Sequence, residues 1–342
     1  MSFQKLHKFP DPDEVLSLKP LSDGLKAIKQ ERDGEIKRIV TGELDKFIVI
    51  IGPCSAHDED AVCDYVSRLA KVQEKVGDKL LLIPRIYTNK PRTTGEGYKG
   101  MLHQPNPEEE PNMLKGLLAI RNMHLRAMAE SGLPAADEML YPENLPYLDD
   151  LLSYIAVGAR SAENQQHRLV ASGIEVPVGM KNPTSGDYNV MFNSIQAAQN
   201  GHVFTFRGYE VKTRSNPLTH AVLRGSVNKH GNSISNYHFE DLLLAIEMYL
   251  ERGLVNPMII VDTNHDNSKK QHDQQVRIVK EILSNRTWDN SIKQVVKGLM
   301  IESFIESGRQ NIGDGIYGKS ITDPCLGWAQ SEELLYYIAE RV

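Results

Sequence analysis

The segment "KFIVIIGPC" (46–54) gives the clearest indication of the fold. It is a continuous run of apolar, mostly β-branched residues that is too short for a helix and ends at Gly-Pro. Runs of this kind, without polar alternation, are typical of strands buried on both faces of a parallel sheet. The segment therefore predicts an α/β protein in which helices cover a parallel sheet.

Further apolar segments follow along the chain, and stretches that we predict to be helical separate them. One such stretch carries Val62, Val66 and Leu69 at helical spacing. The predicted strands after the first are 80–88, 134–140, 154–160, 176–182, 220–226, 258–265 and 298–303. This alternation predicts a (β/α)8 TIM barrel. An open doubly wound sheet is the alternative, but the sequence has neither a G-x-G-x-x-G after the first strand nor a P-loop lysine motif.

Two segments fall outside the barrel pattern. Residues 1–45 precede it, and apolar residues from Leu21 to Ile39 predict a helix that ends at Gly42. We expect residues 1–45 to form an N-terminal helical extension that packs on the barrel or on another subunit, and 46–342 to form the catalytic barrel. Residues 202–219 alternate apolar and polar around a Gly turn, which predicts an inserted β-hairpin.

Composition limits the possible partners and compartment. The chain has 39 Lys plus Arg against 45 Asp plus Glu, a net charge of −6, which argues against nucleic-acid or anionic-membrane binding. No apolar run reaches the roughly 18 residues of a membrane span, and the N-terminus lacks the apolar region of a signal peptide. Three cysteines cannot form a disulfide framework, so we expect a reducing, cytoplasmic location.

Polar residues stand at the ends of the predicted strands, which converge on one face of a barrel. They are Cys54, Arg85, Glu138, Arg160, Lys181, Arg224, His265 and Glu302. The segment "NKPRTTGEGYKG" (89–100) adds Lys90, Arg92 and the hydroxyl of Thr93 close to the second strand. So many cations in an acidic protein predict a local pocket for a small ligand with phosphate and carboxylate groups.

A divalent metal site is a second possibility at this face. Cys54, His265, Glu302 and Asp323 together offer one sulfur, one imidazole and two carboxylates. Each also has an ordinary interpretation, because a cysteine can be a small buried hydrophobe and the carboxylates can pair with the cations. The residues alone leave both interpretations open.

Nine ordered motifs resemble the class I 3-deoxy-D-arabino-heptulosonate 7-phosphate (DAHP) synthases. They are "IGPCSAHD", "PRIYTNKPRTT", "GLPAADEML", "AVGARSAENQQHR", "PVGMKN", "VLRGS", "VDTNHDNSKK", "MIESF" and "YGKSITDPCLGW", within about residues 46–328. The resemblance implies the condensation of phosphoenolpyruvate with erythrose 4-phosphate and water, which gives DAHP and phosphate in the first step of the shikimate pathway.

The resemblance also implies residue roles. Cys54, His265, Glu302 and Asp323 match metal ligands for Mn²⁺, Fe²⁺, Co²⁺ or Zn²⁺, and Asp323 is also among the substrate contacts. The phosphoenolpyruvate contacts are matched by Arg85, Lys90, Arg160, Lys181 and Arg224. The erythrose 4-phosphate contacts are matched by Lys90, Arg92 and Thr93, and Pro91 is also among the substrate contacts. Glu138 matches a carboxylate that positions water, and either Lys90 or His265 is the general acid.

Regulation and assembly follow less directly from the resemblance. It implies a homo-oligomer, dimer or tetramer, and an aromatic amino acid as a possible effector. The loop "YPENLP" (141–146) and the hairpin depart from the pattern of feedback-inhibited members, so the effector stays open. Two other functions compete: another phosphosugar carbon–carbon bond-forming enzyme, such as a class II aldolase or 3-deoxy-octulosonate phosphate synthase, and a non-catalytic regulatory barrel.

Overall fold

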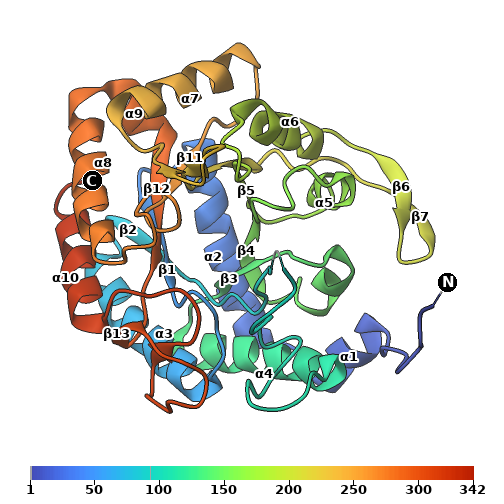
Figure 1. Ribbon diagram of the computed structural model, residues 1–342. Helices are drawn as coiled ribbons and strands as arrows, with labels where there is room; N and C mark the ends of the chain where they lie inside the picture. The colour runs from blue at the N-terminus through green and yellow to red at the C-terminus, as the bar shows by residue number, and fades with distance from the viewer. Residues whose placement is uncertain (1, 93) are drawn as a thin grey trace.

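A closed barrel of eight parallel strands forms the centre of the computed structural model, which describes residues 2–92 and 94–342 (Figure 1). The strand order is β2-β1-β12-β11-β8-β5-β4-β3. The ends of this sheet meet at a parallel bridge between Arg85 and Ala136, where the amide of Ile86 donates to the Ala136 carbonyl at 2.9 Å. The strands are β1 (Phe47–Gly52), β2 (Leu80–Pro84), β3 (Ala135–Glu138), β4 (Leu152–Val157), β5 (Val178–Lys181), β8 (His220–Leu223), β11 (Ile259–Asp262) and β12 (Val296–Glu302). The predicted (β/α)8 barrel is confirmed.

Helices surround the barrel and bury their apolar faces against it (Figure 1). They are α3 (Glu59–Val76), α4 (Met113–Ser131), α5 (Gln165–Ala171), α6 (Tyr188–Ala198), α7 (Phe239–Glu251), α8 (Gln274–Trp288), α9 (Asn290–Val295) and α10 (Trp328–Ala339). Helix α4 ends at Gly132, whose φ of 67° gives a left-handed C-cap.

One predicted helical stretch is different in the structure. The segment between β3 and β4 forms a short 3-10 helix, η1 (Pro142–Tyr147), instead of an α-helix. Pro146, in the interior of this segment, lacks the amide hydrogen that an α-helix needs there, and its ring would clash with the preceding turn. The chain therefore makes only a tight turn here before it enters β4.

Helix α2 (Asp23–Thr41) closes the barrel floor, by which we mean the face at the N-terminal ends of the strands. Ile36, Ile39 and Val40 are buried together with inward-facing strand residues such as Ile48 and Met300. In Figure 1, α2 lies behind the centre of the barrel. The predicted N-terminal helix, ended by a left-handed Gly42, is thus confirmed and packs on the barrel. A shorter helix, α1 (Pro12–Leu18), precedes it.

The predicted inserted hairpin is also confirmed. Strands β6 (Val203–Phe206) and β7 (Tyr209–Lys212) pair antiparallel and project from the side of the barrel (Figure 1). Arg207 and Gly208 have φ values of 51° and 81°, as a two-residue hairpin turn requires. Three features beyond the prediction are α1 and the two-stranded pairs β9 (Ser226–Val227) with β10 (Ser233–Ile234), and β13 (Glu306–Arg309) with β14 (Lys319–Ser320).

Within residues 2–92 and 94–342, no helix combines the length and the apolar character needed to cross a lipid bilayer.

Candidate active site

A cavity of about 120 Å³ opens at the C-terminal ends of the strands. Its lining residues are Cys54, Arg85, Tyr87, Asn89, Lys90, Pro91, Arg92, Glu138, Gly158, Ala159, Arg160, Lys181, Arg224, His265, Lys270 and Asp323. The structure thus brings together the predicted site residues from distant parts of the chain. Two need separate mention: Glu302 lies at the base of the site, and Thr93 lies outside the described residues.

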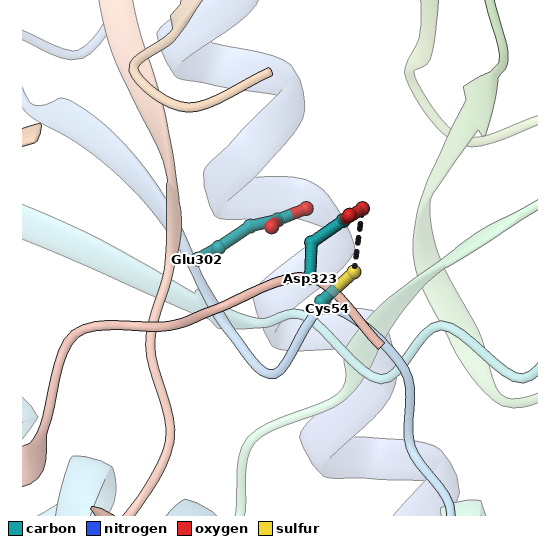
Figure 2. A group of neighbouring side chains, drawn as sticks. All are labelled: Cys54, Glu302 and Asp323. Atoms are coloured by element: carbon teal, nitrogen blue, oxygen red, sulfur yellow. Dashed lines mark hydrogen bonds between the residues drawn. The ribbon is translucent and has the colours of Figure 1, made fainter. Parts of the chain in front are cut away.

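Three of the predicted metal ligands form a compact donor group (Figure 2). One ligand atom from each of Cys54, Glu302 and Asp323 lies within 4.8 Å of the others. Cys54 follows β1 and Glu302 ends β12, so two neighbouring strands present them at the same height. The sulfur of Cys54 lies 3.4 Å from Oδ2 of Asp323. Thiolate and carboxylate donors at this spacing fit a divalent transition metal.

His265, the fourth predicted ligand, lies beside this group but outside it. Its Nε2 is 3.8 Å from Oε1 of Glu302, and its Nδ1 is 2.8 Å from Oδ2 of Asp262. The backbone of His265 has a φ of 47°, which turns the chain sharply after β11. His265 therefore points Nδ1 towards the Asp262 carboxylate and Nε2 towards Glu302 and the donor group.

Lys90 links the donor group to the cationic part of the cavity. Its Nζ lies 2.7 Å from the sulfur of Cys54 and 2.8 Å from Oδ2 of Asp323. Burial opposes the charged form of Lys90, but the neighbouring Cys54, Asp323 and Glu302 outweigh it and raise the pKa of the ammonium. Burial also opposes the charge of Asp323, but Lys90, Lys270 and His265 hold its pKa well below the ordinary value.

The thiol of Cys54 is poorly disposed to ionise without a cation. Burial is the largest cause that raises its pKa, and the carboxylates of Glu302 and Asp323 raise it further. Lys90 and Arg85 act in the opposite direction but do not reverse the shift. A metal ligand must be a thiolate, and a coordinated cation removes the proton.

Asp262 contacts two of the site residues, Lys181 and His265, and is a residue that the sequence analysis missed. It is fully buried at the end of β11, where its Oδ2 accepts a 3.1 Å hydrogen bond from Nζ of Lys181 and faces His265. Burial disfavours the Asp262 carboxylate, but His265, Lys181 and Arg85 hold its pKa far below the ordinary value. Its position three residues before His265 in "VDTNH" is the signal that could have revealed it.

Carboxylates and carbonyls hold the other strand-end cations in place. Nη2 of Arg85 donates to Glu302 at 3.1 Å, and its Nη1 donates to the carbonyl of Cys54 at 3.0 Å. Nη1 of Arg224 donates to Oδ2 of Asp266. The side chains of Arg85 and Arg224 are only 2% and 7% exposed. These contacts therefore fix the positions of their guanidinium groups before any ligand binds.

Glu138 and Arg160 lie on the side of the cavity formed by β3 and β4. Oε1 of Glu138 is buried and has no hydrogen-bond partner among the described residues. It lies only 2.4 Å from where a Cβ would stand on Gly158, so the glycine makes room for the carboxylate. Arg160 follows β4, is exposed, and lines the same cavity.

The loop that carries Lys90 and Arg92 is folded back on itself. The amide of Lys90 donates to the carbonyl of Lys99 at 3.0 Å, and Nε of Arg92 donates to the carbonyl of Tyr98 at 2.8 Å. Gly100 has a φ of 101°, and any side chain there would place its Cβ 2.4 Å from the carbonyl oxygen of Thr88. The loop can therefore pack this closely only with glycine at this position. These contacts present both cations to the cavity from one short segment.

Lys270 is a further cation that the sequence analysis missed. Its Nζ lies 3.7 Å from Oδ1 of Asp323, and its φ of 58° places it on a left-handed turn after β11. The signal was its position in "NHDNSKK", five residues after His265.

The comparisons with known proteins agree with this architecture. Residues 25–336 match the family model described as "DAHP synthetase I family". The chain is 36% identical to a phospho-2-dehydro-3-deoxyheptonate aldolase of Haemophilus influenzae, over 99% of this chain and 93% of that one. A Trp-sensitive phospho-2-dehydro-3-deoxyheptonate aldolase of Enterobacter agglomerans is 37% identical over 89% of this chain and 86% of its own length.

A solved structure gives the same result. The phospho-2-dehydro-3-deoxyheptonate aldolase of Francisella tularensis SCHU S4 superposes with a TM-score of 0.90 at 30% identity, covering 100% of this chain and 98% of that one. Fold, order of motifs and overall length therefore agree, and this chain belongs to the DAHP synthetase I family.

Proposed function

We propose that this chain is a DAHP synthase, which condenses phosphoenolpyruvate with erythrose 4-phosphate and water to give 3-deoxy-D-arabino-heptulosonate 7-phosphate and phosphate. Family membership supports the activity, which is the first step of the shikimate pathway to aromatic amino acids. The observation that carries the assignment is the convergence of seven cationic side chains and a metal-type donor group on one cavity. The two substrates together bring one carboxylate and two phosphates to these charges.

The substrates divide the cavity between two groups of cations. We assign phosphoenolpyruvate to Arg85, Lys90, Arg160, Lys181 and Arg224, and we assign erythrose 4-phosphate to Lys90, Pro91, Arg92, Thr93 and Asp323. Lys181 and Arg224 end adjacent strands and are held by buried carboxylates. Arg92 comes instead from the loop after β2, so we expect the phosphates of the two substrates to bind on different sides of the cavity. We assign Lys90 to the point where the two substrates meet.

A divalent ion, Mn²⁺, Fe²⁺, Co²⁺ or Zn²⁺, is assigned to Cys54, His265, Glu302 and Asp323. The donor set fits such an ion, because the sulfur and carboxylate oxygens lie within 4.8 Å of one another and His265 presents Nε2 beside them. When bound, the ion supplies Lewis-acid polarisation of the sugar aldehyde.

The side chains supply proton transfer and orientation. Carbon–carbon bond formation leaves an alkoxide on the sugar, and Lys90 is our first candidate to protonate it, with His265 as the alternative. Glu138 is assigned to position the water that adds to C2 of phosphoenolpyruvate. Its Oε1 has no protein partner within the described residues, which leaves it available as an acceptor for that water. Phosphate then leaves by cleavage of its C–O bond.

Product formation from both substrates tests this function. Purified enzyme should form DAHP and release phosphate in equal amounts, and Arg160→Ala should reduce both. Arabinose 5-phosphate in place of erythrose 4-phosphate separates this activity from octulosonate synthesis. Equal or faster turnover with arabinose 5-phosphate would refute the assignment, as would no turnover with either aldose in metal-supplemented enzyme.

An aromatic amino acid is the proposed effector, and its proposed site is a second cavity of about 1050 Å³. Helix α2, η1 and the hairpin border this cavity, and Phe204 and Phe206 line it beside charged groups such as Lys29 and Asp149. An apolar wall with nearby charges of both signs suits a zwitterion with an aromatic ring. Inhibition by Phe, Tyr or Trp that Phe206→Ala relieves, with kcat unchanged, would support this site. Unchanged inhibition in that variant would contradict it.

Residues 1–45 are proposed to contribute to a homo-oligomer, a dimer or tetramer. Phe3 and Leu6 are 88% and 74% exposed in the N-terminal segment, and Arg207 of the hairpin lies 3.4 Å from Asp11 of the same segment. Measurement of the mass in solution for the full chain and for a chain lacking residues 2–9 tests this role. The enzyme is proposed to act in the cytoplasm, because its three cysteines are free thiols.

A further inference from the structure

A third cavity lies at the barrel floor, at the opposite end from the candidate active site. We call it the floor cavity; its volume is about 650 Å³. It is lined by Ile39, Gly42, Leu44, Asp45, Lys46, Phe47, Lys79, Arg286, Asn290, Lys293, Gln294, Lys297 and Val342. None of these residues lines the active-site cavity. The floor cavity is therefore a separate site, and binding of a ligand there does not depend on the proposed function.

The lining of the floor cavity is strongly cationic. It holds four lysines and one arginine, and Asp45 is its one acidic side chain. Lys46 is compensated, because its Nζ lies 2.5 Å from Oε1 of Glu35. Within the part of the chain that the structure describes, the other four cations form no ion pair with a carboxylate: Lys79, Arg286, Lys293 and Lys297. An excess of positive charge therefore faces this cavity.

Arg286 is the most buried of these four cations. It is only 8% exposed, and its guanidinium lies 4.5 Å from the ring centroid of Phe47. Its hydrogen bonds within the described residues come from Nη1, which donates to the carbonyls of Val296 and Lys293. Nε and Nη2 thus have no protein acceptor there. Burial lowers the pKa of Arg286 to about 10, and Asp45 only partly offsets this effect.

Lys297, like Arg286, donates its hydrogen bonds to backbone carbonyls rather than to carboxylates. Its Nζ donates to the carbonyl of Val40 at 2.9 Å and to that of Ile39 at 3.3 Å, at the C-terminal end of α2. Burial lowers the pKa of this ammonium, and no carboxylate offsets it. Buried and half-buried like charges are costly unless an anion neutralises them. A bound anion would relieve this cost for Arg286 and Lys297 together.

We propose that the floor cavity binds a small polyanion that carries phosphate groups. The volume lies in the usual range for metabolite sites, and four cations without a carboxylate ion pair among the described residues favour a ligand with more than one negative charge. Arg286 offers the planar donors that grip two phosphate oxygens, and the lysines act as point charges around it. The exposed Lys79 and Lys293 stand at the rim, where a charged ligand would enter.

Inorganic pyrophosphate is the probe for the test, titrated calorimetrically into the full-length enzyme. Lys79→Gln/Lys293→Gln removes two exposed charges from the floor cavity without disturbing a buried contact. Lys71→Gln/Lys280→Gln is the matched control, because it removes two exposed charges from the outer helices α3 and α8. We expect wild type and control to bind pyrophosphate at the floor cavity in addition to the active site.

The floor variant should lose this additional binding, with an affinity at least about tenfold weaker, while its kcat stays unchanged. Pyrophosphate should also raise the Tm of wild type and control more than that of the floor variant. The same isotherm and the same Tm increase in all three proteins would overturn the proposal. Loss of binding in both double variants alike would overturn it too, because it would show an effect of net charge only.

Discussion

The ammonium of Lys90 lies 2.7 Å from the sulfur of Cys54, and this contact joins the two halves of the candidate active site. Cys54 belongs to the metal-type donor group, whereas Lys90 belongs to the cations assigned to the substrates. Asp323 accepts from the same ammonium at 2.8 Å. Metal and substrate binding are therefore expected to influence each other through one lysine.

Removal of divalent metal should abolish DAHP formation, because the assigned donors form a ligand group and the Cys54 thiol needs a cation to ionise. Activity should return on addition of Mn²⁺, Fe²⁺, Co²⁺ or Zn²⁺, although to different extents. The measurement is initial rate after chelation and dialysis, with metal content determined by elemental analysis. Full activity in protein shown to contain no metal would exclude the assigned role.

Arg92→Ala and Arg160→Ala should affect different substrates. Arg92→Ala should raise the KM for erythrose 4-phosphate and Arg160→Ala that for phosphoenolpyruvate. Loss of one charge-assisted contact should lower the corresponding kcat/KM by roughly ten- to a hundredfold. Steady-state kinetics with each substrate varied in turn provides the check. If both variants weakened the same substrate alone, the division of the cavity would be wrong.

Gly158→Ala should reduce kcat with little effect on stability. The new Cβ would lie 2.4 Å from Oε1 of Glu138, and the flexible carboxylate would move away from the position assigned for water. We expect a decrease in kcat of about a hundredfold with small changes in KM. Glu138→Gln should show the same pattern. A normal kcat for Gly158→Ala, with Glu138→Gln inactive, would show that the carboxylate tolerates displacement.

Asp262→Asn should destabilise the metal-free protein by about 3–5 kcal/mol at neutral pH, because it leaves Lys181 without its buried carboxylate partner. The pKa of Asp262 is lowered in the fold, so its contribution is present above the ordinary aspartate pKa of 3.8 and declines as pH falls below that value. Denaturant unfolding should thus show a constant difference between pH 8 and 5 that shrinks in more acidic buffer.

The exposed pair of Arg68 and Asp64 supplies the control for this experiment. Asp64→Asn should change the free energy of unfolding by less than about 1 kcal/mol, because both side chains are about one-third exposed. A difference for Asp262→Asn as small as that of the control would show that the buried contacts contribute no net stability.

Ile39→Ala on α2 should lower the free energy of unfolding by about 2–5 kcal/mol, since the side chain is 1% exposed at the barrel floor. Lys37→Ala, exposed on the same helix, should change it by less than about 0.5 kcal/mol. Equal effects of the two substitutions on chemical denaturation would mean that α2 detaches from the barrel in solution.

That the site residues lie together could be predicted from their positions at the ends of the predicted strands and from the geometry of a barrel. Each predicted strand carries a polar residue at its C-terminal end, and a closed parallel sheet brings those ends to one face. Cys54 and Glu302, far apart in sequence, could therefore be placed together before the fold was known. In the structure, Cys54 and Glu302 lie close together, and with Asp323 they form the metal-type donor group.

Contacts set by packing could not be predicted in the same way. The position of α2 depends on which apolar surface is left open after the barrel closes, and its own residues carry no information about that surface. Asp262 belongs to an apolar strand, and its pairing with Lys181 depends on the register of β11 and β5 around β8. Pro146, by contrast, was a visible signal against the α-helix expected before β4.

The closure of the barrel floor by α2 also bears on how the chain folds as it is synthesised. Lys297 donates to the carbonyl of Ile39 across 258 residues of sequence. The ribosome therefore releases α2 long before β12 exists, and at roughly 5–20 residues per second that interval lasts on the order of tens of seconds. During it, Ile36 and Ile39 lack their partners on the last strand and remain accessible to a chaperone. An early helix thus completes its packing only when the last strand of the barrel emerges.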